Sequence, residues 1–438
     1  MPPDKKSLNI AVIGTGIAGM SAAWLLNKKH SITVFEQNDR TGGHTNTVDA
    51  SMHNFTHPVD TGFIVYNEKN YPNFVALLEY LNVKTQPTTM SFSVSLNRGD
   101  FEFGSSNINT FFGQRPNLIK SDFWKMLVDI RKFFRDAEDF RTKSTEISSI
   151  TLGNFLSQGG YGKPFIEKFI LPMGAAIWSS KPEDIQNQPA ISFINFFSSH
   201  GLLQFVNPVK WRTIVGGSRE YTNKLTAEYS PQINLGQGIK SITRNDSSVV
   251  LQDKSDVQHS FDHVVIATHA DEALTMLADA NRDEQSLLEK FRYNNSRVIL
   301  HSDESLMPKR KIVWSSWNFL GSTKYGVSVT YWMNLLQSIN QDYPYFVSVN
   351  PQIDPKDKLV HRIFQYQHPN FDKNAWTAQQ NLWHLQGKRN TWFCGSYFGY
   401  GFHEDAVQAG LAIAEQLGGV KRPWTTKEHS SRIFRLSD

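Results

Sequence analysis

A glycine-rich turn near the start of the chain constrains its fold more than any other feature. An apolar strand runs into Gly14, Gly16 and Gly19, which have the GxGxxG spacing, and a helical run follows. Gly14 permits a tight turn, Gly16 lets the backbone approach a pyrophosphate, and Gly19 lets the helix pack against the strand. A second strand, residues 32–35, ends at Glu36, whose carboxylate can accept both hydroxyls of an adenosine ribose. This context predicts a dinucleotide-binding βαβ unit, but it does not separate NAD from FAD.

Composition restricts the class of protein and its compartment. Of the 438 residues, 39% are hydrophobic and 20% are charged, which is typical of a globular protein. The formal net charge of +4 is too small to indicate nucleic-acid binding. One cysteine, Cys394, fits a reducing compartment, and no apolar run is long enough for a signal peptide or a membrane span. We expect a cytoplasmic protein, and the aromatic content of 13% allows for an apolar cavity or a transient contact with a membrane surface.

A second glycine pair follows the acidic strand end. Gly42 and Gly43 allow a close backbone approach, and Arg40 can pair with a phosphate. The order GxGxxG, acidic strand end and Arg-x-Gly-Gly resembles the flavin amine oxidase-like superfamily, in which FAD is bound by these two segments. His44 stands where that superfamily usually has Arg. The segment 60–62 is similar to its next loop near the flavin.

Further segments resemble the same superfamily in the same order. Residues 211–220 contain a Gly-Gly pair with Gly217 before a helix at 221–227, and residues 262–268 form an apolar strand that ends in Ala-Thr. Near the C-terminus, a strand at 390–395 ends at Gly395, and a helix at 407–417 follows. The resemblance implies that this helix points its N-terminus at the flavin. Ser396 replaces the usual acidic residue there.

Together the residues and the resemblance predict an FAD site and a group of candidate catalytic residues. The expected cofactor-binding residues are Gly14, Gly16, Ile17, Ala18, Gly19, Glu36, Gln37, Arg40, Gly42, Gly43, His44, Thr45, Gly217, Ile239, Ala267, Thr268, Gly395, Ser396, His403, Glu404, Asp405 and Ala406. The candidates beside the flavin are Tyr397, Tyr400 and His403. We expect Cys394 to be a small buried residue, although a covalent flavin link stays open. We expect no metal site, because the histidines lack metal-ligand spacing.

The remaining segments predict a substrate domain. Residues 71–81 and 123–140 have the pattern of amphipathic helices, the second either packing on a core or lying on a membrane surface. Residues 91–96 and 101–103 are predicted to form a hairpin. Residues 170–179 suit either a cavity wall or a kinked core helix. Strands are expected at 298–301, 326–331 and 345–349. Four aromatic residues between or within them suit the walls of an apolar pocket, although plain core packing accounts for most of this concentration; they are Trp314, Trp317, Tyr331 and Trp332.

We therefore expect an α/β fold in which a Rossmann-like FAD-binding domain with a parallel sheet is interleaved with an α+β substrate domain. The FAD-binding domain takes residues 1–70, 206–290 and 388–438, and the substrate domain takes residues 71–205 and 291–387. The resemblance is strongest to a subgroup of predicted NAD/FAD-binding proteins. That subgroup is similar to the N-terminal FAD portion of plant-type cyclopropane fatty-acid synthases.

The expected function is an FAD-dependent oxidoreductase that transfers hydride between flavin N5 and an apolar, fatty-acyl or lipid-like substrate. One alternative is a flavin-containing amine oxidase, for which Lys324 is a candidate for the lysine–water bridge to N5. Another is a non-catalytic flavoprotein partner of a lipid-modifying enzyme. An NAD-dependent dehydrogenase is disfavoured by the second Gly-Gly segment and by the Gly395 block.

Overall fold

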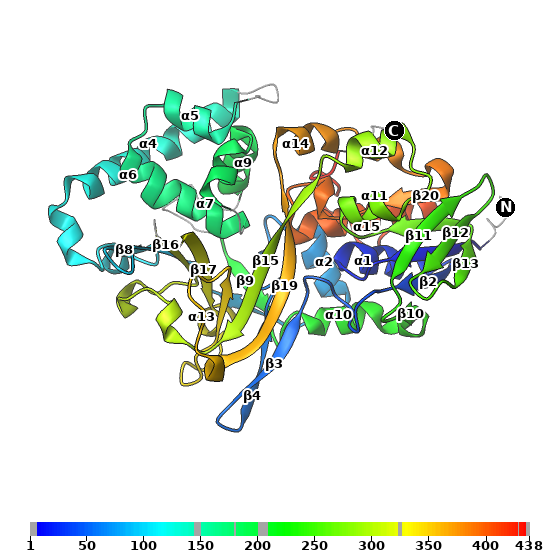
Figure 1. Cartoon of the computed structure of the whole chain (residues 1–438), viewed down its shortest axis with the longest axis horizontal. Coiled ribbons are helices and arrows are strands. Elements are labelled where there is room, and N and C mark those ends of the chain that lie inside the picture. Colours follow the sequence, from blue (N-terminus) through cyan, green and yellow to red (C-terminus); the bar gives the residue numbers. More distant parts are fainter. Residues whose placement is uncertain are drawn as a thin grey trace.

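The computed structural model describes residues 7–143, 150–178, 181–199, 209–322, 326–427 and 429–434. Two lobes lie side by side, and the long strands β15 and β19 run between them (Figure 1). Lys324, the candidate lysine, and Ser179, at the end of the expected cavity wall, lie outside the described residues.

A parallel five-stranded sheet forms the centre of the first lobe. Its order is β10 (Ile233–Asn234), β2 (Ser31–Phe35), β1 (Asn9–Ile13), β14 (His263–Ile266) and β20 (Thr391–Phe393). The inner strands are buried on both faces, as their continuous apolar sequence requires. The sheet thus joins three segments that are far apart in the chain.

Helices and a small antiparallel sheet cover the parallel sheet. The elements of this lobe are α1 (Ile17–Leu26), α2 (Pro72–Tyr80), α10 (Arg219–Thr226), β11 (Ile239–Arg244), β12 (Val249–Asp253), β13 (Gln258–Phe261), α11 (Ala270–Met276), α12 (Arg282–Leu288), α14 (Lys373–Gln379) and α15 (His403–Gly418). Helices α1 and α15 cross so closely that a Cβ on Gly410 would lie 2.2 Å from the carbonyl oxygen of Ala18. This contact brings the C-terminal helix beside the first glycine-rich turn.

The second lobe contains a seven-stranded sheet. Its order is β19 (Val360–Asn370), β15 (Arg292–His301), β18 (Phe346–Val349), β17 (Gly326–Trp332), β16 (Trp317–Ser322), β7 (Phe92–Leu96) and β8 (Phe101–Gly104). Neighbouring strands are antiparallel except β16 and β7, which are parallel. The predicted hairpin of residues 91–96 and 101–103 is β7 and β8.

Helices rich in phenylalanine pack on this sheet around a separate apolar core. They are α3 (Ile108–Phe111), α4 (Ser121–Lys143), α5 (Leu152–Gln158), α6 (Lys163–Phe165), α7 (Leu171–Trp178), α8 (Pro182–Asn187) and α9 (Ala190–Ser199), with the 3-10 turn η1 (Arg115–Ile119) and the π-helical turn η2 (Ile166–Ile170). Phe123, Ile130 and Phe133 of α4 are buried in this core, so the expected amphipathic helix packs as a core helix over most of its length.

The remaining elements are short and are distributed over both lobes. They are the hairpin β3 (Thr47–Met52) and β4 (Phe55–Asp60), the small sheet β5 (Tyr66–Asn67), β9 (Trp211–Ile214) and β6 (Thr85–Thr88), helix α13 (Met333–Gln337), and the short helical turns η3 (Ala227–Gln232), η4 (Glu304–Leu306), η5 (Lys311–Val313), η6 (Asp357–Leu359), η7 (Leu382–Leu385), η8 (Lys388–Asn390) and η9 (Ser396–Phe398). A parallel-sheet lobe interleaved with an α+β lobe is the predicted fold class. The bounds of the five domain segments stay a prediction.

A bilayer-crossing helix needs both length and sustained apolar character, and none of the helices in the described part of the chain has both.

Candidate active site

The GxGxxG turn forms an open cradle at the N-terminus of α1. Gly14 has φ +97°, and a Cβ on Gly19 would lie 2.0 Å from the carbonyl oxygen of Gly14, so both positions require glycine. Gly16, the residue before α1, differs, because no described atom lies within 4 Å of a Cβ built on it. The first N–H groups of a helix point beyond its N-terminus and favour an anion there. This open space therefore fits a diphosphate.

Glu36 ties the cradle to the end of β2. Its Oε2 accepts hydrogen bonds from the backbone N of Thr15, at 2.9 Å, and from Thr15 Oγ1, at 2.5 Å. Its Oε1 accepts from the backbone N and Nδ2 of Asn38, at 2.9 and 2.7 Å. The carboxylate thus fixes the shape of the turn. Ribose recognition by Glu36 stays a prediction, and sequence reasoning missed Thr15 and Asn38.

The second glycine pair packs directly on the first turn. Gly43 has φ +59°, and a Cβ there would lie 3.2 Å from the Cα of Gly16. Arg40 donates to the carbonyl oxygens of Gly43, at 2.8 Å, and Thr45, at 3.1 Å. Arg40 therefore braces the loop between them, and its expected pairing with a phosphate stays a prediction.

His44 lies in a group of aromatic and histidine rings. Its ring centroid is 5.2 Å from that of Tyr366, 5.5 Å from His368 and 6.2 Å from His269. Burial, with the neighbouring histidines, lowers the pKa of His44 to about 3, so the ring is neutral at pH 7. The charge that an arginine would bring is therefore absent at this position. Among the described residues no cluster of His, Cys, Asp and Glu suits a metal ion.

The loop of His44 leads to a second set of rings. The backbone N of Phe63 donates to the carbonyl oxygen of His44 at 2.9 Å. Phe63 stacks on His403, with centroids 3.7 Å apart and an interplanar angle of 8°. His403 Nε2 lies 2.8 Å from the hydroxyl of Tyr221, which is 2.5 Å from Thr45 Oγ1. Hydrogen bonding and stacking thus connect the cradle loop with the first residue of α15.

Asp60 organises the Gly-Gly segment around residue 217. Gly217 has φ +87°, and a Cβ there would lie 2.4 Å from Thr47 Cγ2, so this close approach requires glycine. Asp60 accepts from the backbone N and the hydroxyl of Ser218, and Gln337 also contacts its carboxylate. Burial raises the pKa of Asp60 to about 6 despite these donors.

The two acids at the start of α15 are bound to protein groups. Glu404 accepts from the backbone N of Asn73 and Phe74 and so caps the N-terminus of α2. Asp405 accepts from the backbone N of Phe402 at 2.7 Å and pairs with Arg432 at 2.9 Å. Burial raises the pKa of both carboxyls. They anchor α15 in place.

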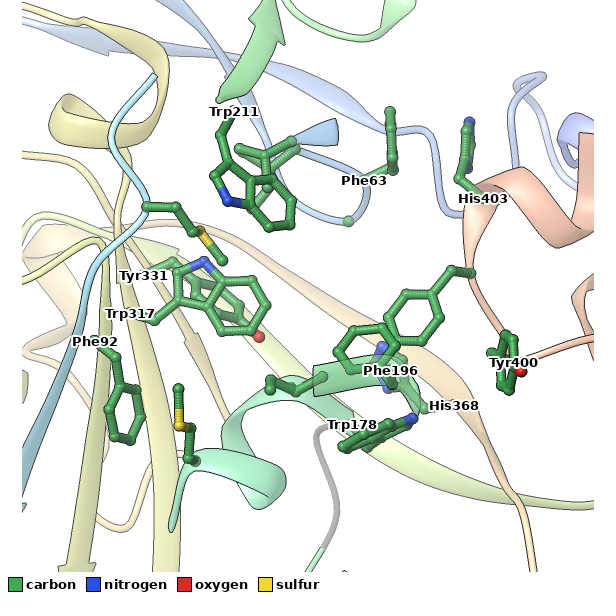
Figure 2. Close-up of a pocket in the computed structure, with 18 of the residues that line it drawn as sticks. Phe63, Phe92, Trp178, Phe196, Trp211, Trp317, Tyr331, His368, Tyr400 and His403 are labelled. Carbon is green, nitrogen blue, oxygen red and sulfur yellow. The ribbon is translucent and has the colours of Figure 1, made fainter. Parts of the chain in front are cut away.

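Next to the stacked rings is an apolar cavity of about 250 Å³ between the two lobes. Figure 2 shows aromatic side chains directed into it from β16, β17, α7, α9 and the loop before α15. Of the described residues, 22 line the cavity, and none of them is Asp, Glu, Lys or Arg. His368 and His403 also border it, and burial lowers their pKa values to about 4 and about 3. The described lining of the cavity is therefore uncharged at neutral pH.

The structure brings two of the three candidate catalytic residues to this cavity. Tyr400 and His403 line it. Tyr397 is 1% exposed, and its ring packs on Phe291 and Phe398 in the core of the first lobe. Sequence reasoning missed Phe63 and Trp211, whose positions depend on long-range packing.

The remaining predicted residues fall into three places. Near the cradle lie Ile17, Ala18, Gly42, Ala267, Thr268, Gly395 and Ser396, with Ala267 against Gly14 and Thr268 beside Gly395. Ile239 is buried in β11, and Ala406 is buried in α15. Gln37 is exposed and accepts a hydrogen bond from Lys254. Of the four aromatic residues expected at a pocket wall, Trp317 and Tyr331 line the cavity, whereas Trp314 and Trp332 pack on each other elsewhere. The pocket-wall interpretation thus describes the first pair, and packing away from the cavity, the other interpretation, describes the second pair.

Comparison with known proteins agrees with this geometry. The family model for flavin-containing amine oxidoreductases matches residues 17–349. No curated protein sequence matches the chain. Putrescine oxidase bound to putrescine superposes with a TM-score of 0.67 at 13% identity, covering 94% of this chain and 99% of that one. Cyclohexylamine oxidase from Brevibacterium oxydans IH-35A gives 0.66 at 16%, covering 94% and 100%. A fatty acid isomerase from P. acnes, which produces CLA, gives 0.63 at 15%, covering 94% and 98%.

The structural likeness shows the fold, and the family model covers well over half of the chain. Proteins of this family contain a flavin, and the open cradle at Gly16 fits the diphosphate of FAD. The chain therefore belongs to the flavin-containing amine oxidoreductase family and is an FAD-dependent oxidoreductase.

Proposed function

We propose that this oxidoreductase acts on a small, uncharged apolar substrate of fatty-acyl or other lipid type, held in the aromatic cavity. The absence of Asp, Glu, Lys and Arg from the 22 described lining residues carries this proposal. A charged group enters such a cavity only at a cost of several kcal/mol unless a partner neutralises it, whereas apolar surface gains about 25 cal/mol per Å² on burial. The walls thus favour a hydrocarbon chain or ring.

Bound FAD supplies hydride transfer at N5, and the protein supplies binding and orientation. Trp178 of α7 and Phe196 of α9 line the cavity on one side, and Trp317 and Tyr331 line it from the seven-stranded sheet. These side chains exclude water from the substrate. The stack with Phe63 and the hydrogen bond to Tyr221 hold the ring of His403 at one end, beside Tyr400. We propose His403 and Tyr400 as the groups that orient the reacting part of the substrate.

An apolar monoamine is the second candidate. Aromatic faces can hold an ammonium group through cation–π attraction, and six indole or phenol rings lie among the described lining residues. Two structural relatives are described as oxidases of putrescine and of cyclohexylamine. A diamine such as putrescine is disfavoured here, because its second ammonium would have no carboxylate among the described lining residues. The relative that is described as a fatty acid isomerase favours the lipid candidate.

Flavin absorbance under anaerobic conditions tests these candidates. The purified protein is mixed with fatty acyl esters, with cyclohexylamine and with putrescine, and bleaching of the flavin band is recorded. Dithionite-reduced protein is mixed with unsaturated acyl esters to test the reverse direction. We expect a response to an acyl ester in one direction and no response to putrescine. Bleaching by putrescine alone would contradict the proposal.

The same experiment addresses a non-catalytic role as partner of a lipid-modifying enzyme. A protein that keeps its flavin but responds to no substrate class would favour that role. A cytoplasmic location stays a prediction, supported by the single cysteine, which is buried.

A further inference from the structure

Large apolar side chains are exposed together at the outer end of the second lobe. Among the described residues, 14 large hydrophobic side chains are exposed, and five of them fall between residues 108 and 128. These five are Ile108, Leu118, Ile119, Trp124 and Val128, exposed by 79%, 39%, 90%, 49% and 68%. Ile312, exposed by 42%, joins them, since its side chain lies 3.0 Å from a Cβ built on Gly113. We call these six residues the apolar tip.

Local packing holds the apolar tip in a defined shape. Trp124 Nε1 donates to the carbonyl oxygen of Leu118 at 2.8 Å, and its ring lies 6.3 Å from that of Phe112. Arg115 donates to the carbonyl oxygen of Phe112 at 2.9 Å, which joins α3 to η1. The indole is thus half-exposed with its N–H satisfied. Tryptophan in this state is typical of the boundary between lipid and water.

Basic residues surround the apolar tip. Of the four charged residues between 115 and 125, Arg115, Lys120 and Lys125 are basic, and Asp122 alone is acidic. All four are exposed. The segment that carries Ile312 begins with Lys309, Arg310 and Lys311, of which Arg310 pairs with Glu102 and Lys311 with Glu304. A positive rim around exposed apolar side chains is complementary to anionic headgroups over hydrocarbon.

The position of the tip suits contact with a surface. Its residues 108–128 lie in the cyan segment at the far left of Figure 1, at one end of the longest axis of the molecule. The other exposed apolar residues, such as Val257 and Ile363, lie on separate elements. We infer that the apolar tip docks the enzyme on the surface of an anionic lipid bilayer. Like α7, which walls the cavity, the tip belongs to the second lobe, so docking would bring this lobe to the bilayer.

Vesicle co-sedimentation of the flavin-loaded full chain tests this inference. We expect the protein to sediment with vesicles of phosphatidylcholine and phosphatidylglycerol, more weakly with phosphatidylcholine alone, and less as salt is added. The double variant Ile108→Ser and Ile119→Ser should lower the affinity at least about tenfold. Both side chains are almost fully exposed, so the variant should fold and keep its flavin.

Two further variants separate apolar docking from other effects. Val257→Ser with Ile363→Ser removes two apolar side chains elsewhere, each about half exposed, and should bind vesicles as the wild type does. Lys120→Glu with Lys125→Glu should reduce binding to anionic vesicles and leave weak binding to phosphatidylcholine unchanged. Equal binding by all variants would overturn the inference. So would a dimer in gel filtration that Ile108→Ser with Ile119→Ser dissociates, because the tip would then bind a second copy of the chain.

Discussion

The hydroxyl of Tyr221 lies 2.8 Å from Nε2 of His403, although 182 residues separate the two in the chain. The same hydroxyl is 2.5 Å from Thr45 Oγ1, in the loop that packs on the GxGxxG turn. Tyr221 is fully buried in α10, and His403 begins α15. One phenol therefore joins the cofactor cradle to the edge of the substrate cavity.

Replacing Tyr221 with Phe tests this connection. We expect Tyr221→Phe to lower the free energy of unfolding by about 1–3 kcal/mol, because two buried partners lose their hydrogen bond. Tyr229→Phe is the matched control, since Tyr229 is equally buried and donates to the carbonyl oxygen of Met20 at 3.0 Å, away from the cavity. Urea unfolding should show a loss in both variants. Flavin reduction by substrate should slow about tenfold in Tyr221→Phe alone, and equal rates in both variants would contradict the connection.

Because the space around Gly16 is open, we predict that a larger residue at this position leaves the protein folded but without its cofactor. A valine there would extend into space that is free of described protein atoms, so Gly16→Val should fold but block the diphosphate. Gly19→Val is the contrasting variant, because its Cβ would lie 2.0 Å from a backbone oxygen and disrupt the packing of α1 on β1. Circular dichroism and the visible spectrum distinguish the outcomes. Flavin retained by Gly16→Val would refute the diphosphate role of this turn.

Sequence reasoning succeeded where the signal is local. The strand, glycine turn and helix that lead to Glu36 follow one another within 28 residues, and the structure has them as β1, α1 and β2. The first turn of α15 was missed, because His403, Glu404 and Asp405 have no apolar periodicity. In the structure, Asp405 accepts the backbone N–H of Phe402, so the helix begins four residues before the predicted Val407.

The cavity could be predicted only in part, because its walls come from distant segments. Trp314 and Trp317 are three residues apart, yet only Trp317 borders the cavity, while Trp314 packs against Trp332. Trp317 begins β16, whereas Trp314 follows η5 and lies outside the strands. For a residue within a strand, the sequence gives no sign of which face of the sheet it occupies until the strand order is known. Here β16 lies between β17 and β7, and that order depends on contacts more than 200 residues apart.

A carboxylate in the cavity should change the class of substrate. Ile177 lines the cavity from α7, and Ile177→Asp would place an acid among uncharged walls. We expect kcat/KM for an acyl substrate to fall at least about tenfold, and an amine to gain relative to it, since the acid can pair with an ammonium. Ile353→Asp, at a position exposed by 51%, is the control and should leave the kinetics unchanged. An unchanged ratio between the two substrates in Ile177→Asp would contradict the assigned cavity.

Acidification should destabilise the protein through its buried neutral histidines, and His301 offers the clearest case. His301 is fully buried in β15, its Nε2 lies 2.8 Å from Ser348 Oγ, and its Nδ1 accepts the backbone N–H of Asp303. Burial lowers the pKa of His301 from 6.5 to about 4, so the folded ring stays neutral while the unfolded chain takes up a proton. Stability is therefore fully present above pH 6.5 and falls as the pH drops towards 4, by about 1.4 kcal/mol per pH unit for this residue.

His44, His368 and His403 act in the same direction. Asp60, whose pKa is raised to about 6, acts in the opposite one, as do Glu404 and Asp405, whose pKa values burial also raises. Urea unfolding at several pH values between 7.5 and 4.5 measures the net effect. We expect the wild type to lose stability throughout this range, and His301→Gln to lose it less steeply, by the equivalent of about one proton. His301→Gln would start from a lower stability at pH 7.5, because glutamine cannot reproduce both hydrogen bonds of the ring. An identical slope in wild type and variant would show that His301 is protonated in the folded protein.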